Sequence, residues 1–337
     1  MTWQSNLKGD PIPWLLEKNN PSVRYLTLTT LLDRAEDDPE VCEARAAIAA
    51  SEPVQAILAS QASDGYWAKP GWGYTPKYQG TVWQIIFLGL LAADAADPRV
   101  RRGCEYLLAH SRASSGPFSA SASGGLSGAI HCLNGNLIYA LLRLGYRGDP
   151  RLDDALDWLA RSITGNGFEP KYRYYKSGLV GPGFLCADTN GLACAWGAVK
   201  ALMALGAVPE ADRSEAVQEA IEASAEFLLG NDLAHAAYPT GWGTKPSSVW
   251  FKFGFPLGYT SDVLEALLAL GEAGYGADPR LKEATQLVLS KQDERGRWRL
   301  DNSLNGKMWT DIEAKRRPSK WVTWRALRAL KLGEGGG

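Results

Sequence analysis

QASDGYW at residues 61–67 and QDERGRW at residues 292–298 share one pattern: glutamine, three residues, glycine, one residue and tryptophan. Each copy follows a helix-like stretch and precedes a loop. A glutamine near a helix end, a glycine that turns the chain and a tryptophan that packs back would clamp one helix pair to the next. Two copies indicate a repeat protein, and a repeat decides the fold. The equivalent residues are Gln61 and Gln292, Gly65 and Gly296, Trp67 and Trp298.

A second repeated element marks helix starts. Asp-Pro-Arg occurs at residues 97–99, 149–151 and 278–280, and Asp-Pro-Glu at 38–40 is a degenerate copy. Aspartate is a good N-cap and proline suits the first helical position, so each triplet begins a helix. Residues 209–217 fill the remaining position.

Two kinds of helix alternate along the chain. The first kind is apolar on more than one face, as a helix buried on several sides must be. These helices are predicted at 22–32, 80–92, 129–144, 192–205, 261–270 and 320–330. The second kind is more charged and has one wet face, at 41–59, 100–109, 152–160, 216–229 and 281–290, with a short N-terminal helix near 13–18.

This alternation predicts an all-α fold, an (α/α)6 toroid of six inner and six outer helices. Residues 1–332 form the single predicted domain, and the glycine-rich residues 333–337 a disordered tail. Glycine-rich connectors such as 112–127, 165–183 and 235–248 would gather at one end of the ring. Residues 112–127, rich in serine and glycine, are the predicted mobile loop.

Composition excludes several classes of protein. The net charge of −1 gives no electrostatic basis for binding nucleic acid or an anionic membrane. No basic, apolar leader begins the chain, and its most apolar stretch, residues 85–93, is too short to span a bilayer. The five cysteines are odd in number and widely spaced, which favours reduced thiols in the cytoplasm.

The glutamine–tryptophan pattern resembles the QW motif of squalene–hopene and oxidosqualene cyclases, whose toroid is shared with protein prenyltransferase β subunits. The chain is most similar to short, single-toroid proteins labelled squalene cyclase-like or prenyltransferase-like. The stretches that carry this likeness are 20–34, 290–298 and 317–331. The resemblance implies a terpenoid-cyclase type of fold and an active site in the ring's centre.

The chain departs from those cyclases in two ways. It lacks their Asp-x-Asp-Asp proton donor, and it has one domain where triterpene cyclases have two. The adjacent aspartates 37–38 and 153–154 fall at outer-helix starts, where capping explains them. Squalene-sized chemistry is therefore not expected.

Reactive side chains gather at the predicted starts of two inner helices. His131, Cys132 and Asn136 begin the third, and Cys186, Asp188 and Cys194 lead into the fourth. Three interpretations stay open. The thiols with Asp188 or His131 bind zinc, as in the zinc-dependent prenyltransferases; or they act as acid–base partners without a metal; or they are packing residues, with His131 at the surface.

Aromatic and acidic residues form a third candidate group. Their rings would stabilise a carbocation or line an apolar pocket, and Asp262 would serve either as a second acid or as a helix cap. The buried cations Lys200 and Arg325 should pair with acids. The candidate substrate-binding residues are Tyr78, Trp83, Asn136, Tyr259, Trp309 and Trp321.

The leading hypothesis is an enzyme that performs acid–base chemistry on a small apolar isoprenoid-like substrate: cyclisation, isomerisation or hydration/dehydration. Its proposed catalytic residues are Asp188, Cys186, Cys194, Cys132, His131 and Asp262. No cofactor is needed. The alternatives are a zinc enzyme that activates a thiol, and a non-catalytic toroid with a filled centre, for which a cavity below a few hundred Å³ would be the sign.

Overall fold

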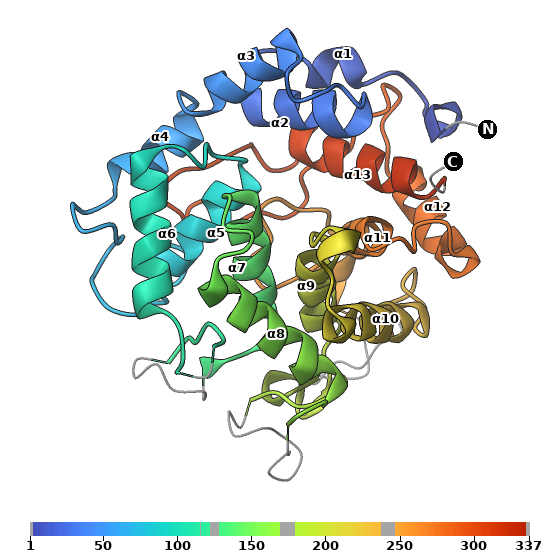
Figure 1. Cartoon of the computed structure of the whole chain (residues 1–337). Helices are drawn as coiled ribbons and strands as arrows, with labels where there is room; N and C mark the ends of the chain where they lie inside the picture. Colours follow the sequence, from blue (N-terminus) through green and yellow to red (C-terminus); the bar gives the residue numbers. More distant parts are fainter. Residues whose placement is uncertain (1–2, 115, 122–127, 169–178, 237–246, 335–337) are drawn as a thin grey trace.

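The computed structural model describes residues 3–114, 116–121, 128–168, 179–236 and 247–334. Helices dominate it, and they form two concentric layers around a central axis (Figure 1). The inner layer consists of α2 (Pro21–Leu26) continued by the π-helical η2 (Thr27–Leu31), α5 (Thr81–Leu90), α7 (His131–Arg143), α9 (Ala195–Gly206), α11 (Val263–Glu272) and α13 (Lys320–Leu332). The predicted all-α ring is confirmed.

The outer layer supplies one partner for each inner helix. It consists of α1 (Ile12–Leu15), the pair α3 (Pro39–Ile48) and α4 (Glu52–Ala59), α6 (Pro98–His110), α8 (Pro150–Thr164), α10 (Glu215–Leu229) and α12 (Lys282–Ser290). Short 3-10 turns complete the chain at η1 (Trp3–Asn6), η4 (Ala187–Thr189), η5 (Glu210–Asp212), η6 (Ser248–Phe251) and η7 (Pro279–Leu281).

Most residues of the inner helices are buried, which explains why most of them are apolar. Every residue of α5 from Thr81 to Gly89 is buried. Neighbouring inner helices pack in the order α5, α7, α9, α11, α13 and η2. In chain order, the last inner helix, α13, is joined to the first by Trp324, whose Nε1 donates to Thr30 Oγ1 on η2 at 3.0 Å. The chain therefore closes into a ring.

The clamp pattern works as a hydrogen-bonded unit. Trp67 Nε1 donates to the carbonyl of Ile57 at 2.7 Å, and its backbone N–H donates to Thr81 Oγ1 at 3.1 Å. The second copy repeats both bonds: Trp298 donates to Val288 at 2.8 Å and to Thr323 at 3.0 Å. Each tryptophan is fully buried, so each clamp joins an outer helix to the inner helix that follows it.

A third, degenerate clamp lies at residues 112–118, and sequence reasoning missed it. Arg112 takes the place of glutamine and Phe118 that of tryptophan. The Nε of Arg112 donates to the Gly116 carbonyl at 3.2 Å, as Gln61 does to Gly65. The backbone N–H of Phe118 donates to Asn134 Oδ1 at 2.8 Å on the next inner helix.

The Asp-Pro-Arg triplets cap helices as predicted and also tie outer helices together. In each, the aspartate accepts a hydrogen bond from the backbone N–H of the arginine, and the arginine side chain returns to the same carboxylate. The guanidinium of Arg151 also reaches Glu105 at 2.8 Å, and that of Arg280 reaches Glu226 at 3.0 Å. Each partner lies on the preceding outer helix.

Two helix boundaries differ from prediction. The helix predicted at 41–59 is two helices, because Pro53 cannot continue a helix and starts a new one instead. The helix predicted from 192 begins at Ala195, since β2 (Leu192–Ala193) pairs antiparallel with β1 (Leu185–Cys186). Gly333, the first residue of the predicted tail, caps α13 by donating its N–H to the Ala329 carbonyl, and residues 335–337 lie outside the described part.

Parts of the connectors predicted to gather at one end, 122–127, 169–178 and 237–246, also lie outside the described residues. All five cysteines are free thiols. Among the described residues, no helix has both the length and the apolar character needed to cross a membrane.

Candidate functional site

Four aromatic side chains pack together where α5 and α11 begin, and we call them the aromatic cluster: Tyr74, Tyr78, Trp83 and Tyr259. The ring centroids of Tyr78 and Trp83 are 4.8 Å apart, and those of Trp83 and Tyr259 are 5.1 Å apart. Tyr74 lies 5.6 Å from Trp83 and accepts its indole N–H on the backbone carbonyl at 2.9 Å. Three members match the prediction, and Tyr74 was missed.

The backbone of Tyr78 has a φ of +70°, in the left-handed region that a tyrosine rarely adopts. Its carbonyl accepts a hydrogen bond from Gln84 Nε2 at 3.0 Å, which helps to hold this conformation. A strained backbone of this kind persists only when its surroundings fix it.

A positive charge lies against the aromatic cluster. The ammonium of Lys77 is 5.3 Å from the ring centroid of Tyr78, 5.5 Å from that of Tyr259 and 5.9 Å from that of Trp83. Aromatic faces attract cations at such distances. Lys77 was also missed; the signal for it and Tyr74 was the run of aromatics around a proline, Tyr74 to Tyr78, just ahead of an inner helix.

The thiols of Cys132, Cys186 and Cys194 form a second group, the thiol cluster. The β1–β2 hairpin brings Cys186 back to Cys194, which caps α9 by accepting the Gly197 N–H at 3.4 Å. A hydrogen bond from the Cys194 thiol lowers the pKa of Cys186 to about 7, against the opposite effect of burial. The same bond and burial raise the pKa of Cys194.

Burial and the charge of Cys186 raise the pKa of Cys132 to about 12. Cys132 in turn acts on the aromatic cluster: burial first, then the charges of Cys132 and Tyr74, raise the pKa of Tyr259. The two clusters are therefore electrostatic neighbours. Together they contain one thiol that ionises near neutral pH and two that stay protonated.

His131 does not join the thiols, although it precedes Cys132. Adjacent helical residues point about 100° apart. The imidazole instead packs between α7 and α8, 5.5 Å from the ring of Phe184 and 6.3 Å from that of Trp158. It is 3% exposed, not at the surface, and burial lowers its pKa to about 4. Packing explains its position.

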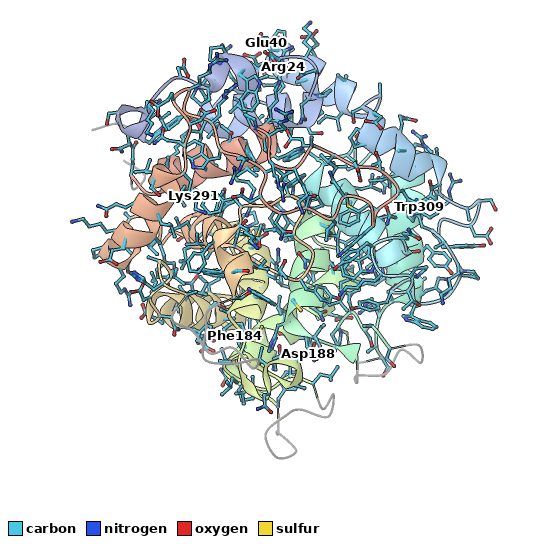
Figure 2. All side chains as sticks on the ribbon, turned by 180° about the vertical axis from the view of Figure 1, so that it is seen from behind. Arg24, Glu40, Phe184, Asp188, Lys291 and Trp309 are labelled. Atoms are coloured by element: carbon cyan, nitrogen blue, oxygen red, sulfur yellow. The ribbon has the colours of Figure 1, made fainter. Side chains whose placement is uncertain are left out.

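Asp188 is exposed on η4, and only its backbone N–H and its charge act on Cys186. Figure 2 shows Asp188 near Phe184 at the α8–α9 side of the ring, away from Trp309 on the α4–α5 side. Asn136 lies closer to the centre: its Nδ2 donates to the carbonyls of Cys132 at 2.9 Å and Gly258 at 3.0 Å.

Asp262 is fully buried, and its carboxylate is engaged with the protein. It accepts the N–H of Glu265 at 2.7 Å as the cap of α11, the N–H of Gly254 at 2.9 Å, and Arg325 Nη2 at 3.2 Å. Lys200 and Glu265 form a second buried pair at 2.6 Å. The prediction that both buried cations pair with acids is confirmed, and Asp262 has a structural role as cap and counterion.

The other two candidate tryptophans, Trp309 and Trp321, make no ring contact with the aromatic cluster in the described part of the chain. Trp309 is 41% exposed, and its indole N–H donates to the Gln79 carbonyl at 3.0 Å. Trp321 stacks on Phe255 with centroids 4.0 Å apart and planes 8° apart.

The cavity on the ring axis is small. Its volume is about 40 Å³, room for little more than water, and its lining includes the Lys200–Glu265 pair, Arg325, Asn136 and Trp321. Side chains of the described inner helices therefore fill most of this part of the centre.

A zinc site requires at least three ligand atoms that lie close enough together to bind one ion. In the described part of the chain, one group of three has all its ligand atoms within 4.8 Å of one another: the exposed Asp232, His235 and Glu283. The thiol cluster with Asp188 or His131 does not meet this spacing. These residues do not fit a tetrahedral zinc site.

The sequence matches no protein family and no curated protein. Among solved structures it is similar to a protein from Actinoplanes, with 16% identity, a TM-score of 0.43 and coverage of 95% of this chain and 90% of that one. It is also similar to the type II terpene cyclase MstE from Scytonema, with 14% identity, a TM-score of 0.42 and coverage of 93% and 87%.

Proposed function

We propose that the chain is a terpenoid cyclase-like enzyme that performs acid–base chemistry on a small apolar isoprenoid-like substrate. The observation that carries this proposal is the aromatic cluster, which holds a cation beside the thiol cluster. The Lys77 ammonium, held against these aromatic faces, would stabilise the negative charge that develops on the carbonyl oxygen of a substrate when a proton is removed.

The thiols favour isomerisation over the other reactions of this class. A thiol whose pKa is about 12 is too weak an acid to protonate a simple alkene. A thiolate next to a protonated thiol can, however, move a proton between two carbons of a conjugated carbonyl compound. Cys186 would take the proton from one carbon, and Cys194 would return one to the other. His131 and Asp262 have no part in this step.

The test incubates the full chain in D2O with prenyl aldehydes and prenyl alcohols of 10 to 20 carbons. Mass spectrometry follows isomers and incorporated deuterium. We expect incorporation into the aldehydes, lost in Cys186→Ser and retained in Cys42→Ser, whose thiol is exposed on an outer helix. Incorporation that does not depend on Cys186 would contradict the proposal.

A non-catalytic ring is the second candidate, and the small central volume favours it. At about 40 Å³ the cavity is far below the few hundred Å³ usual for ligand sites. In that case the chain would not convert the prenyl compounds, and no deuterium would enter them in the test above. Deuterium incorporation therefore separates the two candidates.

A further inference from the structure

The opposite end of the ring axis has a larger cavity, which we call the mouth cavity. Its volume is about 280 Å³, near the lower end for small-molecule sites. It shares five lining residues with the central cavity, so the two cavities are adjacent. These are Tyr139, Arg143, Met203, Leu268 and Trp324.

The mouth cavity lies where the inner helices end. It takes lining residues from α7, α9, α11 and α13 and from η2. The turns from inner to outer helices at this end are all among the described residues. Half of the lining residues are apolar: Leu142, Met203, Ala207, Leu268 and Trp324.

The charges around the mouth cavity do not cancel. Arg328 pairs with Glu272 at 2.8 Å, which neutralises both. Arg143 has no carboxylate within 4.0 Å among the described residues. The nearby Tyr25 hydroxyl donates to Glu36, and Glu36 pairs with Arg45 at 3.0 Å, so this carboxylate does not neutralise Arg143. One positive charge is left over at the rim.

The guanidinium of Arg143 is held in place but only partly used. Its Nε donates to the Gly89 carbonyl at the end of α5 at 3.1 Å, and Nη1 donates to the Tyr139 hydroxyl at 3.4 Å. The group also lies 5.6 Å from the Tyr139 ring centroid. A guanidinium has five N–H donors, so most of one planar edge remains for an acceptor.

We propose that the mouth cavity binds an amphipathic monoanion: a carboxylate on an apolar chain. The carboxylate would meet Arg143, because a planar two-oxygen group matches the guanidinium fork. The chain would run along Met203, Leu268 and Trp324 toward the central cavity. This site is separate from the thiol and aromatic clusters, so it stands whether or not the proposed function does.

Calorimetric titration of the full chain with dodecanoate, below its micelle concentration, tests the proposal. We expect saturable 1:1 binding, weakened about tenfold or more in Arg143→Met, as for the loss of a charged hydrogen-bond pair. Arg143→Lys should retain part of the affinity. Arg101→Met is the matched control, because it removes an exposed arginine from outer helix α6 and should change nothing.

Two further measurements fix the cause and the place. Dodecanol has the same chain and no charge, so it should bind more weakly than dodecanoate and equally to the wild type and Arg143→Met. Leu268→Trp, which fills the cavity without touching the charge, should also abolish dodecanoate binding. Equal affinity for dodecanoate and dodecanol, or an Arg143→Met variant that loses stability but keeps full affinity, would reduce Arg143 to a helix cap and overturn the proposal.

Discussion

Single residues explain why the clamp pattern needs glycine. Gly65 has a φ of +101°, and a Cβ there would come within 2.6 Å of the Arg102 carbonyl oxygen. The glycine therefore serves both the turn and the close approach of an outer helix. The spacing of the pattern made this role predictable from sequence, since glycine and tryptophan two residues apart imply a tight turn that packs back.

A matched pair of substitutions separates these two effects. Gly71 has a φ of +107° but open space around its would-be Cβ. Both Gly65→Ala and Gly71→Ala carry the backbone strain, of about 1 kcal/mol or more. Only Gly65→Ala adds the clash, so we expect it to unfold at clearly lower denaturant concentration. Equal losses of unfolding free energy in urea titrations would mean that Arg102 moves away from the added methyl group at no energetic cost.

His131 should make stability depend on pH. Burial lowers its folded pKa to about 4, from an ordinary value of 6.5. Between these values the unfolded chain binds a proton that the folded chain does not, so stability falls as the pH drops through this window. The loss is on the order of 3 kcal/mol by pH 4.

Unfolding free energies of the wild type, His131→Leu and His110→Gln at pH 7, 5.5 and 4.5 check this expectation. The profile of His131→Leu should be flatter than that of the wild type. The exposed His110 serves as the control and should leave the slope unchanged. Parallel profiles for all three proteins would mean that His131 is protonated without cost.

At the scale of elements, the sequence predicted which helices exist and which groups begin them, but not where those groups point. His131 and Cys132 are adjacent in the chain, yet they lie on different sides of α7, because the rotation of a helix is set by all of its neighbours. The β1–β2 hairpin was missed since two-residue strands leave no alternation to detect. Yet that hairpin brings Cys186 to Cys194.

One buried ion pair, Lys200 with Glu265, joins α9 to α11. Glu265→Gln would leave the Lys200 ammonium without its counterion, at a cost of about 3–5 kcal/mol. Replacing both residues, Lys200→Met with Glu265→Leu, should restore most of the stability. Glu272→Gln at the more exposed Arg328 pair should cost less than about 1 kcal/mol. A double variant as unstable as Glu265→Gln would refute the charge-based account.

At the scale of the whole molecule, the repeat predicted the ring, because each apolar helix needed neighbours on several sides. It did not predict how full the ring is. Cavity volume is the small difference between the space enclosed by six helices and the summed volume of their side chains. The packing of large residues such as Trp321 and Phe255 determines this volume, and no local sequence pattern predicts that packing.

Ring closure should make unfolding cooperative, and the single-domain organisation remains a prediction. An open repeat array can fray from its ends, whereas here the last inner helix packs on the first. We expect one thermal transition with coincident midpoints by far-UV circular dichroism and tryptophan fluorescence. Separate midpoints, or a stable proteolytic fragment of two or three hairpins, would point to independent units.

The closure between α13 and η2 also suggests that the two ends of the chain could be placed at another position in the ring. Helix α13 contacts η1 near the amino end, and Figure 1 shows both chain ends on the same side of the ring. Every hairpin has two neighbours, so the order in which the hairpins are connected carries little structural information. A circular permutant, with the old ends joined by a flexible linker and new ends in the turn at 145–148, should therefore assemble the same ring.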